Sequence, residues 1–378
     1  MVGEKKTLAH RPLRVGVLGC GMIALGTQGY APGMKTIPEK VEFVAACDTA
    51  EERLDVAERE FQARERYYRL EDMLEKSDID VVLNLTPIPL HGATTIKILQ
   101  AGKHVVTEKP LATTMEDADT IVNLAAKQDK HVIVAPPNML QPTRQLAKQL
   151  VEDGAIGQVA FARVRGSHGG PAAGNWPLDP TWFYQEGSGP LFDMGVYGIH
   201  DITGILGPAK RVVAFSGITE PVRTVRGGPF KGKKIDVTAD DNTLLMLDFG
   251  NSTFAVVDGT FNVNAAKSPA VEIFGRSGTL NLNDRHEGAA LPPLELFKLD
   301  AVPGVDGWIT PRAGAMMAEQ ERQRSLKRAV VLDHLVDCLW EQKKPILSVE
   351  HGRHALEIML KAIESARTGK AVDLVTVF

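Results

Sequence analysis

The sequence predicts an α/β protein with two domains: a doubly wound parallel sheet, then an α+β domain with an open, mostly antiparallel sheet. Up to about residue 136, short apolar runs alternate with stretches whose apolar residues recur at helical spacing, the order typical of βαβ units. Beyond it, consecutive strands joined by tight turns indicate antiparallel pairing. The 378 residues agree with two domains, because a single core rarely grows beyond about 300 residues.

The first domain is predicted over residues 13–136, after an N-terminal tail at residues 1–12. The apolar runs predict strands at residues 13–18, 41–47, 81–85, 104–107 and 131–135. The segments between them predict helices at residues 51–61, 70–76, 92–101 and 115–127.

The second domain is predicted over residues 137–378, beginning where Pro136 and Pro137 break the pattern. It is expected to start with a helix at residues 143–152. Expected strands follow at residues 159–166, 212–218, 242–249, 253–262, 271–274 and 279–282. Helices are predicted at residues 318–342 and 351–368, and the Gly/Lys/Arg-rich segment 224–234 is expected to be an exposed loop.

Composition excludes several classes of protein. With 44% hydrophobic residues, 24% charged residues and a net charge of −4, nothing indicates binding to nucleic acid or to a membrane surface. The three cysteines are too scattered for a disulfide framework, and no cluster has metal-ligand spacing, so no metal is expected. No segment approaches the ~18 apolar residues that span a bilayer, and residues 1–14 lack the apolar core of a signal peptide. We therefore expect a cytoplasmic protein.

A glycine turn joins the first strand to a predicted helix. Gly19 suits the tight turn, Gly21 lets the backbone approach a pyrophosphate, and Ala24 allows close packing of helix on strand. Met22 and Ile23 would then lie at the helix start, where N–H groups favour an anion. The turn predicts a dinucleotide site.

Asp48 ends the second strand, 24 residues beyond Ala24. A carboxylate there accepts hydrogen bonds from both ribose hydroxyls and repels a 2′-phosphate, which favours NAD over NADP. Alternatively, Asp48 caps the helix that begins near Glu51. Arg53 is close enough in sequence to leave NADP possible.

Two further strand ends carry candidate cofactor residues. Thr86 and Pro87 follow the third strand, and His91 lies near the next helix start, either touching the cofactor or lying at the surface. Glu108 and Lys109 follow the fourth strand. A charged lysine at the end of a buried strand indicates a functional role. We expect Lys109 near the reactive ring of the nicotinamide.

These motifs resemble the glucose–fructose oxidoreductase / inositol dehydrogenase / MocA family over nearly the whole chain. The matching segments are Gly19-Cys20-Gly21-x-x-Ala24, Leu85-Thr86-Pro87 with His91, Glu108-Lys109-Pro110-Leu111-Ala112, Gly154-Ala155-Ile156-Gly157, Asp193-Met194-Gly195-Val196-Tyr197-Gly198-Ile199-His200, Gly275-Arg276-Ser277-Gly278-Thr279, and the last helix with Gly369.

The resemblance implies a Rossmann domain, followed by a sheet domain through which homodimers or homotetramers form. It also implies NAD(P)-dependent oxidation or reduction of a sugar, a polyol or a related carbohydrate. Lys109 matches the family's catalytic lysine and Asp193 its substrate-site aspartate. Tyr197 stands where many members carry His, and His200 where many carry Asp or Asn. These departures leave the substrate and the proton carrier open.

The chemistry of this cluster agrees with a dehydrogenase. Asp193, Tyr197 and His200 have i, i+4 and i+7 spacing, within about 60° around a regular α-helix. An alcohol that loses hydride must also lose its hydroxyl proton, so a base is needed. Tyr197 can accept it if the charge of Lys109 stabilises the phenolate, or Lys109 can act itself. Asp193 would orient the substrate, while His200 is a proton relay, a substrate ligand or a core residue.

Residues 169–189 form a Gly/Pro-rich segment just before Asp193. Its Trp176 and Trp182 could stack on the C–H faces of a sugar, or serve packing or a subunit contact. His168 and Asn175 are further candidates for substrate contacts.

Three functions compete. The first is an NAD-dependent dehydrogenase that acts on a carbohydrate hydroxyl. The second is a redox-neutral glycosidase or lyase that retains NAD and works through a transient 3-keto sugar. The third is a non-catalytic NAD-linked sensor, which would have no need of Lys109, Asp193 and Tyr197.

Overall fold

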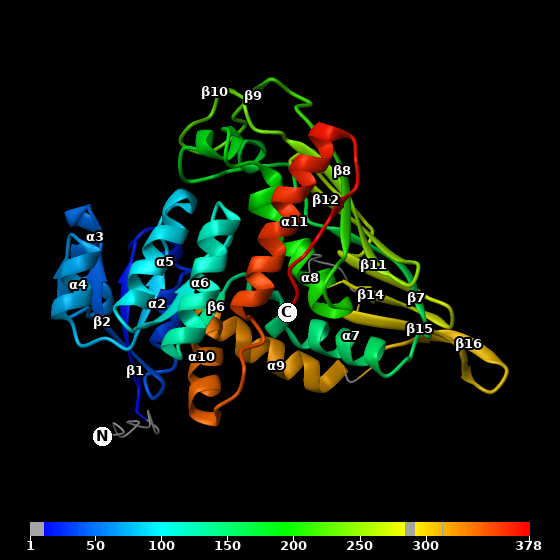
Figure 1. Cartoon of the computed structure of the whole chain (residues 1–378), viewed down its shortest axis with the longest axis horizontal. Helices are drawn as coiled ribbons and strands as arrows, with labels where there is room; N and C mark the ends of the chain where they lie inside the picture. Colours follow the sequence, from blue (N-terminus) through cyan, green and yellow to red (C-terminus); the bar gives the residue numbers. More distant parts are fainter. Residues whose placement is uncertain (1–10, 284–291, 312) are drawn as a thin grey trace. The chain divides into compact units, whose positions relative to one another are not determined.

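The computed structural model describes residues 11–283, 292–311 and 313–378, so most of the predicted tail at residues 1–12 lies outside the described residues (Figure 1). The chain forms two units. Unit 1 comprises the chain up to Pro137 together with Ala318–Arg353, and unit 2 comprises Asn138–Met317 and His354–Phe378. The predicted second domain spans residues 137–378, whereas in the structure Ala318–Arg353 belong to unit 1.

Contacts inside unit 1 explain this difference. Lys40 forms ion pairs of 2.6 Å with both Asp333 and Asp337. The backbone N–H of Val134 donates to the carbonyl of Leu347 over 3.2 Å. The late segment therefore completes the first unit, which periodicity alone could not indicate.

Unit 1 is built on a six-stranded parallel sheet of order β3-β2-β1-β4-β5-β6. Its strands are β1 Leu13–Leu18, β2 Val41–Cys47, β3 Glu65–Tyr67, β4 Val81–Asn84, β5 His104–Thr107 and β6 Val132–Val134. The central strands are apolar and almost fully buried, as parallel sheets covered on both faces require. The five predicted strands are present. The short, polar edge strand β3 was missed.

The helices and turns of unit 1 are α1 Met22–Leu25, α2 Tyr30–Met34, α3 Glu51–Phe61, α4 Leu70–Lys76, η1 Ile88–Leu90, α5 His91–Gln100, α6 Met115–Gln128, η6 Lys327–Ala329 and α10 Val330–Glu341. The helix predicted at residues 318–342 is interrupted, because Lys327 has a positive φ of 53°. Two longer helices, α9 Ala313–Leu326 and α11 Val349–Thr368, belong in part to each unit.

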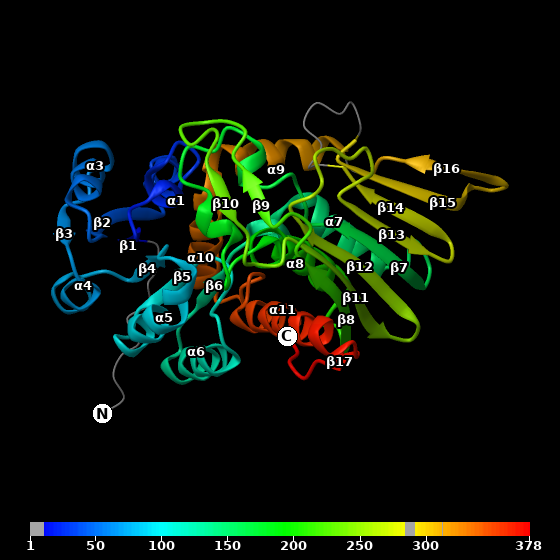
Figure 2. The ribbon, with the colours of Figure 1, turned by 90° about the horizontal axis from the view of Figure 1, so that it is seen from above.

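Unit 2 contains a nine-stranded mixed sheet of order β16-β15-β14-β13-β7-β12-β11-β8-β17 (Figure 2). The strands are β7 Val159–Arg165, β8 Arg211–Gly217, β11 Asn242–Gly250, β12 Thr253–Thr260, β13 Val271–Gly275, β14 Gly278–Leu282, β15 Leu294–Val302, β16 Val305–Ile309 and β17 Val372–Asp373. Among the described strand pairs of this sheet, β7 with β12 is parallel and the others are antiparallel. The predicted architecture is confirmed.

The helices and turns of unit 2 are η2 Pro137–Leu140, α7 Pro142–Glu152, η3 Pro171–Ala173, η4 Thr181–Tyr184, the π-helical turn η5 Leu191–Gly195 and α8 Val196–Leu206. Helix α8 packs against β7, β12 and β13, and α7 packs against α8 and β14. None of the helices in the described part of the chain has the length and apolar character needed to cross a bilayer.

A second small sheet borders the loop predicted at residues 224–234, and most residues of this loop are exposed. Strands β9 Val222–Thr224 and β10 Lys234–Asp236 pair antiparallel across this segment. Val225, just after β9, is only 2% exposed. The segment is therefore a hairpin whose base is packed.

Candidate active site

The predicted cofactor residues gather at one edge of the unit 1 sheet, which we call the carboxyl edge. They follow β1, β2, β4 and β5, whose carboxyl ends share an edge because these strands are parallel. Strand β1 lies between β2 and β4, the point where the strand order reverses. Open α/β sheets bind ligands at such a switch point.

The glycine turn packs closely against the loop after β4. Gly19 has a φ of +91°, and a Cβ there would lie 2.6 Å from the carbonyl oxygen of Leu85. Gly21 differs, because nothing lies within 4 Å of the position of a Cβ. Ala24 is fully buried, whereas Met22 is 40% exposed. The open space beside Gly21 fits the predicted passage of a pyrophosphate, so the turn fits NAD.

Asp48 links the glycine turn to the end of β2. Its Oδ2 accepts a hydrogen bond of 2.7 Å from the N–H of Cys20, and its Oδ1 accepts one of 2.9 Å from Ala50. Arg53 lies 3.4 Å away and is half exposed. The N-cap of α3 is Ala50, so the alternative in which Asp48 caps that helix is wrong.

The turn after β5 is held by contacts to its glutamate. The N–H of Glu108 donates to the carbonyl of Asn84 over 3.2 Å. Its Oε1 accepts from the hydroxyl of Tyr30 at 3.4 Å and from Arg328 at 3.3 Å. Lys109 is half-buried, and the Lys109-Pro110 peptide is cis. Arg328 lies 220 residues from Glu108 in the chain, so no local pattern predicts this contact.

His91 is not a surface residue. It is 1% exposed, and its ring nitrogens lie 2.7 Å from the carbonyl oxygens of Pro110 and Thr86. Burial lowers the pKa of His91, and its carbonyl partners act in the opposite direction. Both ring nitrogens thus face protein groups, and this geometry does not favour direct contact with a cofactor.

In unit 2, Asp193 and Tyr197 lie on successive but different helical turns. Asp193 belongs to the π-helical turn η5, and Tyr197 is the second residue of α8. The regular α-helical spacing expected from Asp193 to His200 is therefore wrong. The cause is the wider turn, since π-helical bonding joins i to i+5. Both side chains are half-buried.

Glycines let η5 approach the sheet. A Cβ on Gly166, just after β7, would lie 2.7 Å from the carbonyl oxygen of Met194. A Cβ on Gly259 would lie 3.1 Å from the Cα of Leu191. Side chains at these positions would push away the segment that carries Asp193.

A buried polar cluster behind α8 was missed by the sequence analysis. The guanidinium of Arg144 bonds the carboxylate of Asp201 over 3.2 and 3.3 Å, and both side chains are fully buried. The amide of Asn138 donates to Asp201 over 2.8 Å and to the carbonyl of Tyr197 over 3.3 Å. The available signal was an acid within a largely apolar helix. The cluster fixes the turn that carries Tyr197.

His200 lies in the interior of unit 2, 3% exposed. Burial lowers its pKa to about 4, so the ring is neutral at neutral pH. This environment matches the core-residue alternative for His200 more closely than a proton relay.

The segment at residues 169–189 packs on the β9–β10 hairpin through an aromatic cluster. Its buried members are Ala172, Phe183, Tyr184, Val225, Ile235, Val237 and Phe261. Trp176 packs against this cluster, edge-on to Phe183 at 5.6 Å. Trp182 lies 4.2 Å from the same ring but is 47% exposed. Of the two tryptophans, Trp182 has the freer ring face.

The other two substrate candidates differ in their environment. Nδ1 of His168 accepts a hydrogen bond of 2.7 Å from the N–H of Gly170, and its ring stacks on Phe261 at 5.4 Å. This assigns the proton of the neutral ring to Nε2. Asn175 is exposed and lies beside Gly227 of the hairpin.

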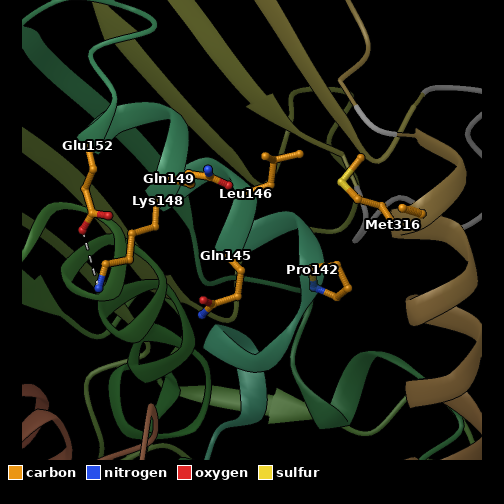
Figure 3. A pocket seen from close by; sticks show the side chains of 8 residues that line it. Pro142, Gln145, Leu146, Lys148, Gln149, Glu152 and Met316 are labelled. Carbon is orange, nitrogen blue, oxygen red and sulfur yellow. Dashed lines mark ion pairs between the residues drawn. The ribbon is translucent and has the colours of Figure 1, made fainter.

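A separate hollow lies between α7 and the first turn of α9, with a volume of about 450 Å³. Figure 3 shows Gln145, Lys148, Glu152 and Met316 around it, with Lys148 paired to Glu152. None of the predicted site residues lines it, so it is not the candidate active site.

Comparison with known families agrees with the geometry. Residues 13–136 match the family described as "Oxidoreductase family, NAD-binding Rossmann fold". Residues 144–281 match the "GFO/IDH/MocA C-terminal domain". The chain belongs to the Gfo/Idh/MocA oxidoreductase family.

Relatives within this family include sugar dehydrogenases. Levoglucosan dehydrogenase of Pseudarthrobacter phenanthrenivorans is 32% identical over 56% of this chain, and the match spans 57% of that enzyme. Myo-inositol 2-dehydrogenase of Thermotoga maritima is 26% identical over 71% of this chain and 74% of the enzyme. The WlbA dehydrogenase of Bordetella pertussis, solved with NADH and UDP-GlcNAcA, superposes with a TM-score of 0.77 at 22% identity, covering 97% of this chain and 99% of that one.

The family match confirms three predictions: the Rossmann fold, the NAD cofactor and the oxidoreductase class. The chain is therefore an NAD-binding oxidoreductase. These relatives give no support to the redox-neutral alternative.

Proposed function

We propose that this dehydrogenase transfers a hydride between NAD and the hydroxyl or carbonyl carbon of a sugar, a polyol or a related carbohydrate. The observation that carries the proposal is Lys109, which follows β5 at the carboxyl edge, in the turn fixed through Glu108 and Pro110. When bound, NAD supplies the hydride acceptor for alcohol oxidation.

The proposed cofactor residues of the carboxyl edge act in groups. Gly19, Gly21, Met22, Ile23 and Ala24 form the turn beside the pyrophosphate, and Asp48 accepts from the ribose hydroxyls. Thr86, Pro87, Glu108 and Lys109 lie in the loops after β4 and β5, where we place the nicotinamide side of the site.

The proposed reaction uses three side chains. Lys109 or Tyr197 removes the hydroxyl proton as hydride leaves the same carbon, because the carbonyl product requires both losses. Asp193 accepts a hydrogen bond from a substrate hydroxyl and orients the ring. His200 is left out of the proposed reaction because its side chain is only 3% exposed.

The proposed substrate class rests on the aromatic segment as well as on the relatives. Trp182 offers a half-exposed ring suited to the C–H face of a pyranose or cyclitol. His168, Asn175 and Trp176 are proposed to shape the same region of unit 2. Their polar atoms suit a substrate with several hydroxyls.

We also propose that two copies of the chain meet through the outer face of the nine-stranded sheet. On this face Phe215 pairs with Leu244, and Met246 pairs with Val256, in neighbouring strands. These side chains are 40–81% exposed, a patch that monomers rarely leave in water. A second copy is the favoured occupant, because Arg163 and Glu272 lie beside these apolar residues on the same face and carry opposite charges that a second copy can match.

The test of the function is Lys109→Met with an active carbohydrate, found by following NADH absorbance across sugars, polyols and sugar acids. Turnover should fall by about 10²- to 10⁴-fold, the contribution of a positioned acid–base group. The dissociation constant of NAD should stay within about threefold, since Met keeps the unbranched side chain as far as Cε and removes only the amine. Lys103→Met, at the opposite end of β5, is the matched control and should retain activity. Near-normal turnover of Lys109→Met would exclude the proposed role.

A further inference from the structure

His91 lies behind the loops that form the carboxyl edge. It is the first residue of α5, directly after the turn η1, and only 1% of its surface is exposed. One ring nitrogen lies 2.7 Å from the carbonyl oxygen of Pro110 and the other 2.7 Å from that of Thr86. A carbonyl oxygen only accepts hydrogen bonds, so each contact is a hydrogen bond only when the facing ring nitrogen carries a proton.

The two carbonyls belong to different loops. Thr86 lies two residues after the end of β4, and Pro110 directly follows Lys109. Strands β4 and β5 are parallel neighbours, with Asn84 paired to Thr107. The imidazole thus joins the outer parts of both loops, beyond the last strand pair.

The loop after β4 also supports the glycine turn. The carbonyl of Leu85 is the group that a Cβ on Gly19 would strike at 2.6 Å. Asn84, the last residue of β4, stabilises this loop. Its side chain accepts a hydrogen bond from the hydroxyl of Thr86 at 2.8 Å and donates one to the carbonyl of His91 at 3.2 Å. Displacement of His91 would therefore loosen the turn after β5, whereas the bond of 2.8 Å from the N–H of Leu85 to the carbonyl of Leu18 still holds the loop after β4 beside Gly19.

We propose that His91 is a positioning residue that fixes the Lys109-Pro110 turn against the loop after β4, and through it sets the place of the Lys109 amine. This inference rests on the proposed role of Lys109. A protonated ring donates to both carbonyls and a neutral ring to one, and in either state the ring fills the space between the loops. His91 itself touches neither cofactor nor substrate.

The experiment compares His91→Phe, which keeps a ring and removes both donors, with His91→Gln, which keeps an amide donor. Amide hydrogen exchange of the full-length, cofactor-free protein reports the turn without any substrate. Exchange in residues 107–112 should accelerate in His91→Phe and partly recover in His91→Gln. With NAD and an active substrate, kcat should fall by up to about 100-fold in His91→Phe, the cost of misplacing a reacting group by about 1 Å. The dissociation constant of NAD should change less than about threefold.

His104→Phe is the matched control. His104 is also buried, at the opposite end of β5. Its replacement should lower thermal stability without changing exchange in residues 107–112 or kcat. Unchanged exchange and kcat in His91→Phe would overturn the proposal, as would a kcat loss that follows lost NAD binding. If His91→Phe does not fold, His91→Gln decides, and a kcat equal to that of the unmodified protein overturns the proposal.

Lys109→Met, measured in parallel, separates the two proposals. If it keeps its turnover, the role of Lys109 fails, and the positioning role of His91 fails with it. If it loses turnover while His91→Phe does not, only the inference about His91 fails.

Discussion

The carboxyl edge of unit 1 and the region around α8 in unit 2 are held together in different ways. At the carboxyl edge, side chains mainly bond backbone groups: Asp48 accepts from N–H groups, and His91 contacts two carbonyls. Around α8, side chains bond one another in the interior, as Arg144 does with Asp201. The first kind of site depends on backbone shape and the second on matched pairs of side chains.

The buried pair of unit 2 should show the largest effect. Arg144→Met leaves the carboxylate of Asp201 buried without its cation, which costs about 3–5 kcal/mol. Denaturant unfolding should show this loss, and Arg144→Met/Asp201→Asn should recover part of it. Lys148→Met, on the exposed side of α7, is the control and should change stability little. If Arg144→Met lost as little unfolding free energy as Lys148→Met, the buried pair would not stabilise unit 2 in the way described.

The second largest expected effect is a loss of unfolding free energy at acidic pH, caused by buried histidines. Burial lowers the pKa of His200 to about 4, whereas an unfolded chain binds that proton near pH 6.5. The unfolded state binds more protons between these values, so stability falls as pH drops from about 6.5 to 4, by about 3 kcal/mol. His200→Gln should flatten this part of the curve of unfolding free energy against pH. An unchanged slope would mean that His200 is not buried neutral. His104→Gln gives the comparison in unit 1, since burial lowers its pKa to about 3.

At the carboxyl edge, Asp48→Ser should change cofactor choice. The carboxylate that would accept from the ribose hydroxyls is removed, and Arg53 is released from its 3.4 Å contact. The preference for NAD over NADP should fall by about tenfold, the loss of one charge-assisted hydrogen bond. The ratio of kcat/KM with the two cofactors measures this change. An unchanged ratio would restrict Asp48 to holding the glycine turn.

The smallest effect on folding is expected on the outer face of the unit 2 sheet. Phe215 is 81% exposed, so Phe215→Glu should change the unfolding free energy by no more than about 0.5 kcal/mol. Sedimentation velocity should nevertheless shift toward the monomer, because a charge then lies in the proposed contact. Val375→Glu, at an equally exposed position in the C-terminal tail, should not change sedimentation. A monomer before any substitution would contradict the proposed assembly.

The same difference between backbone contacts and paired side chains explains why the sequence predicts one region better than the other. Gly19, Gly21 and Asp48 stand at fixed spacing because backbone geometry demands it, so a local motif finds them. Arg144 and Asp201 are 57 residues apart, and no local pattern joins them. The π-helical turn at Asp193 escaped prediction, since it depends on packing against Gly166 and Gly259. The sequence singles out His91 as a candidate, but its burial depends on how the loops after β4 and β5 fold around it, which no local pattern predicts.

Unit 1 is made from two distant pieces of chain, and this matters for how the protein is synthesised. When the ribosome has produced the first 137 residues, Lys40 and Val134 still lack the partners that Asp333, Asp337 and Leu347 provide. Those partners emerge only after the intervening 180 residues, Asn138–Met317, have been made. The cofactor-binding unit, first in the sequence, is therefore expected to be completed late in translation, and truncation after Pro137 should yield an unstable fragment.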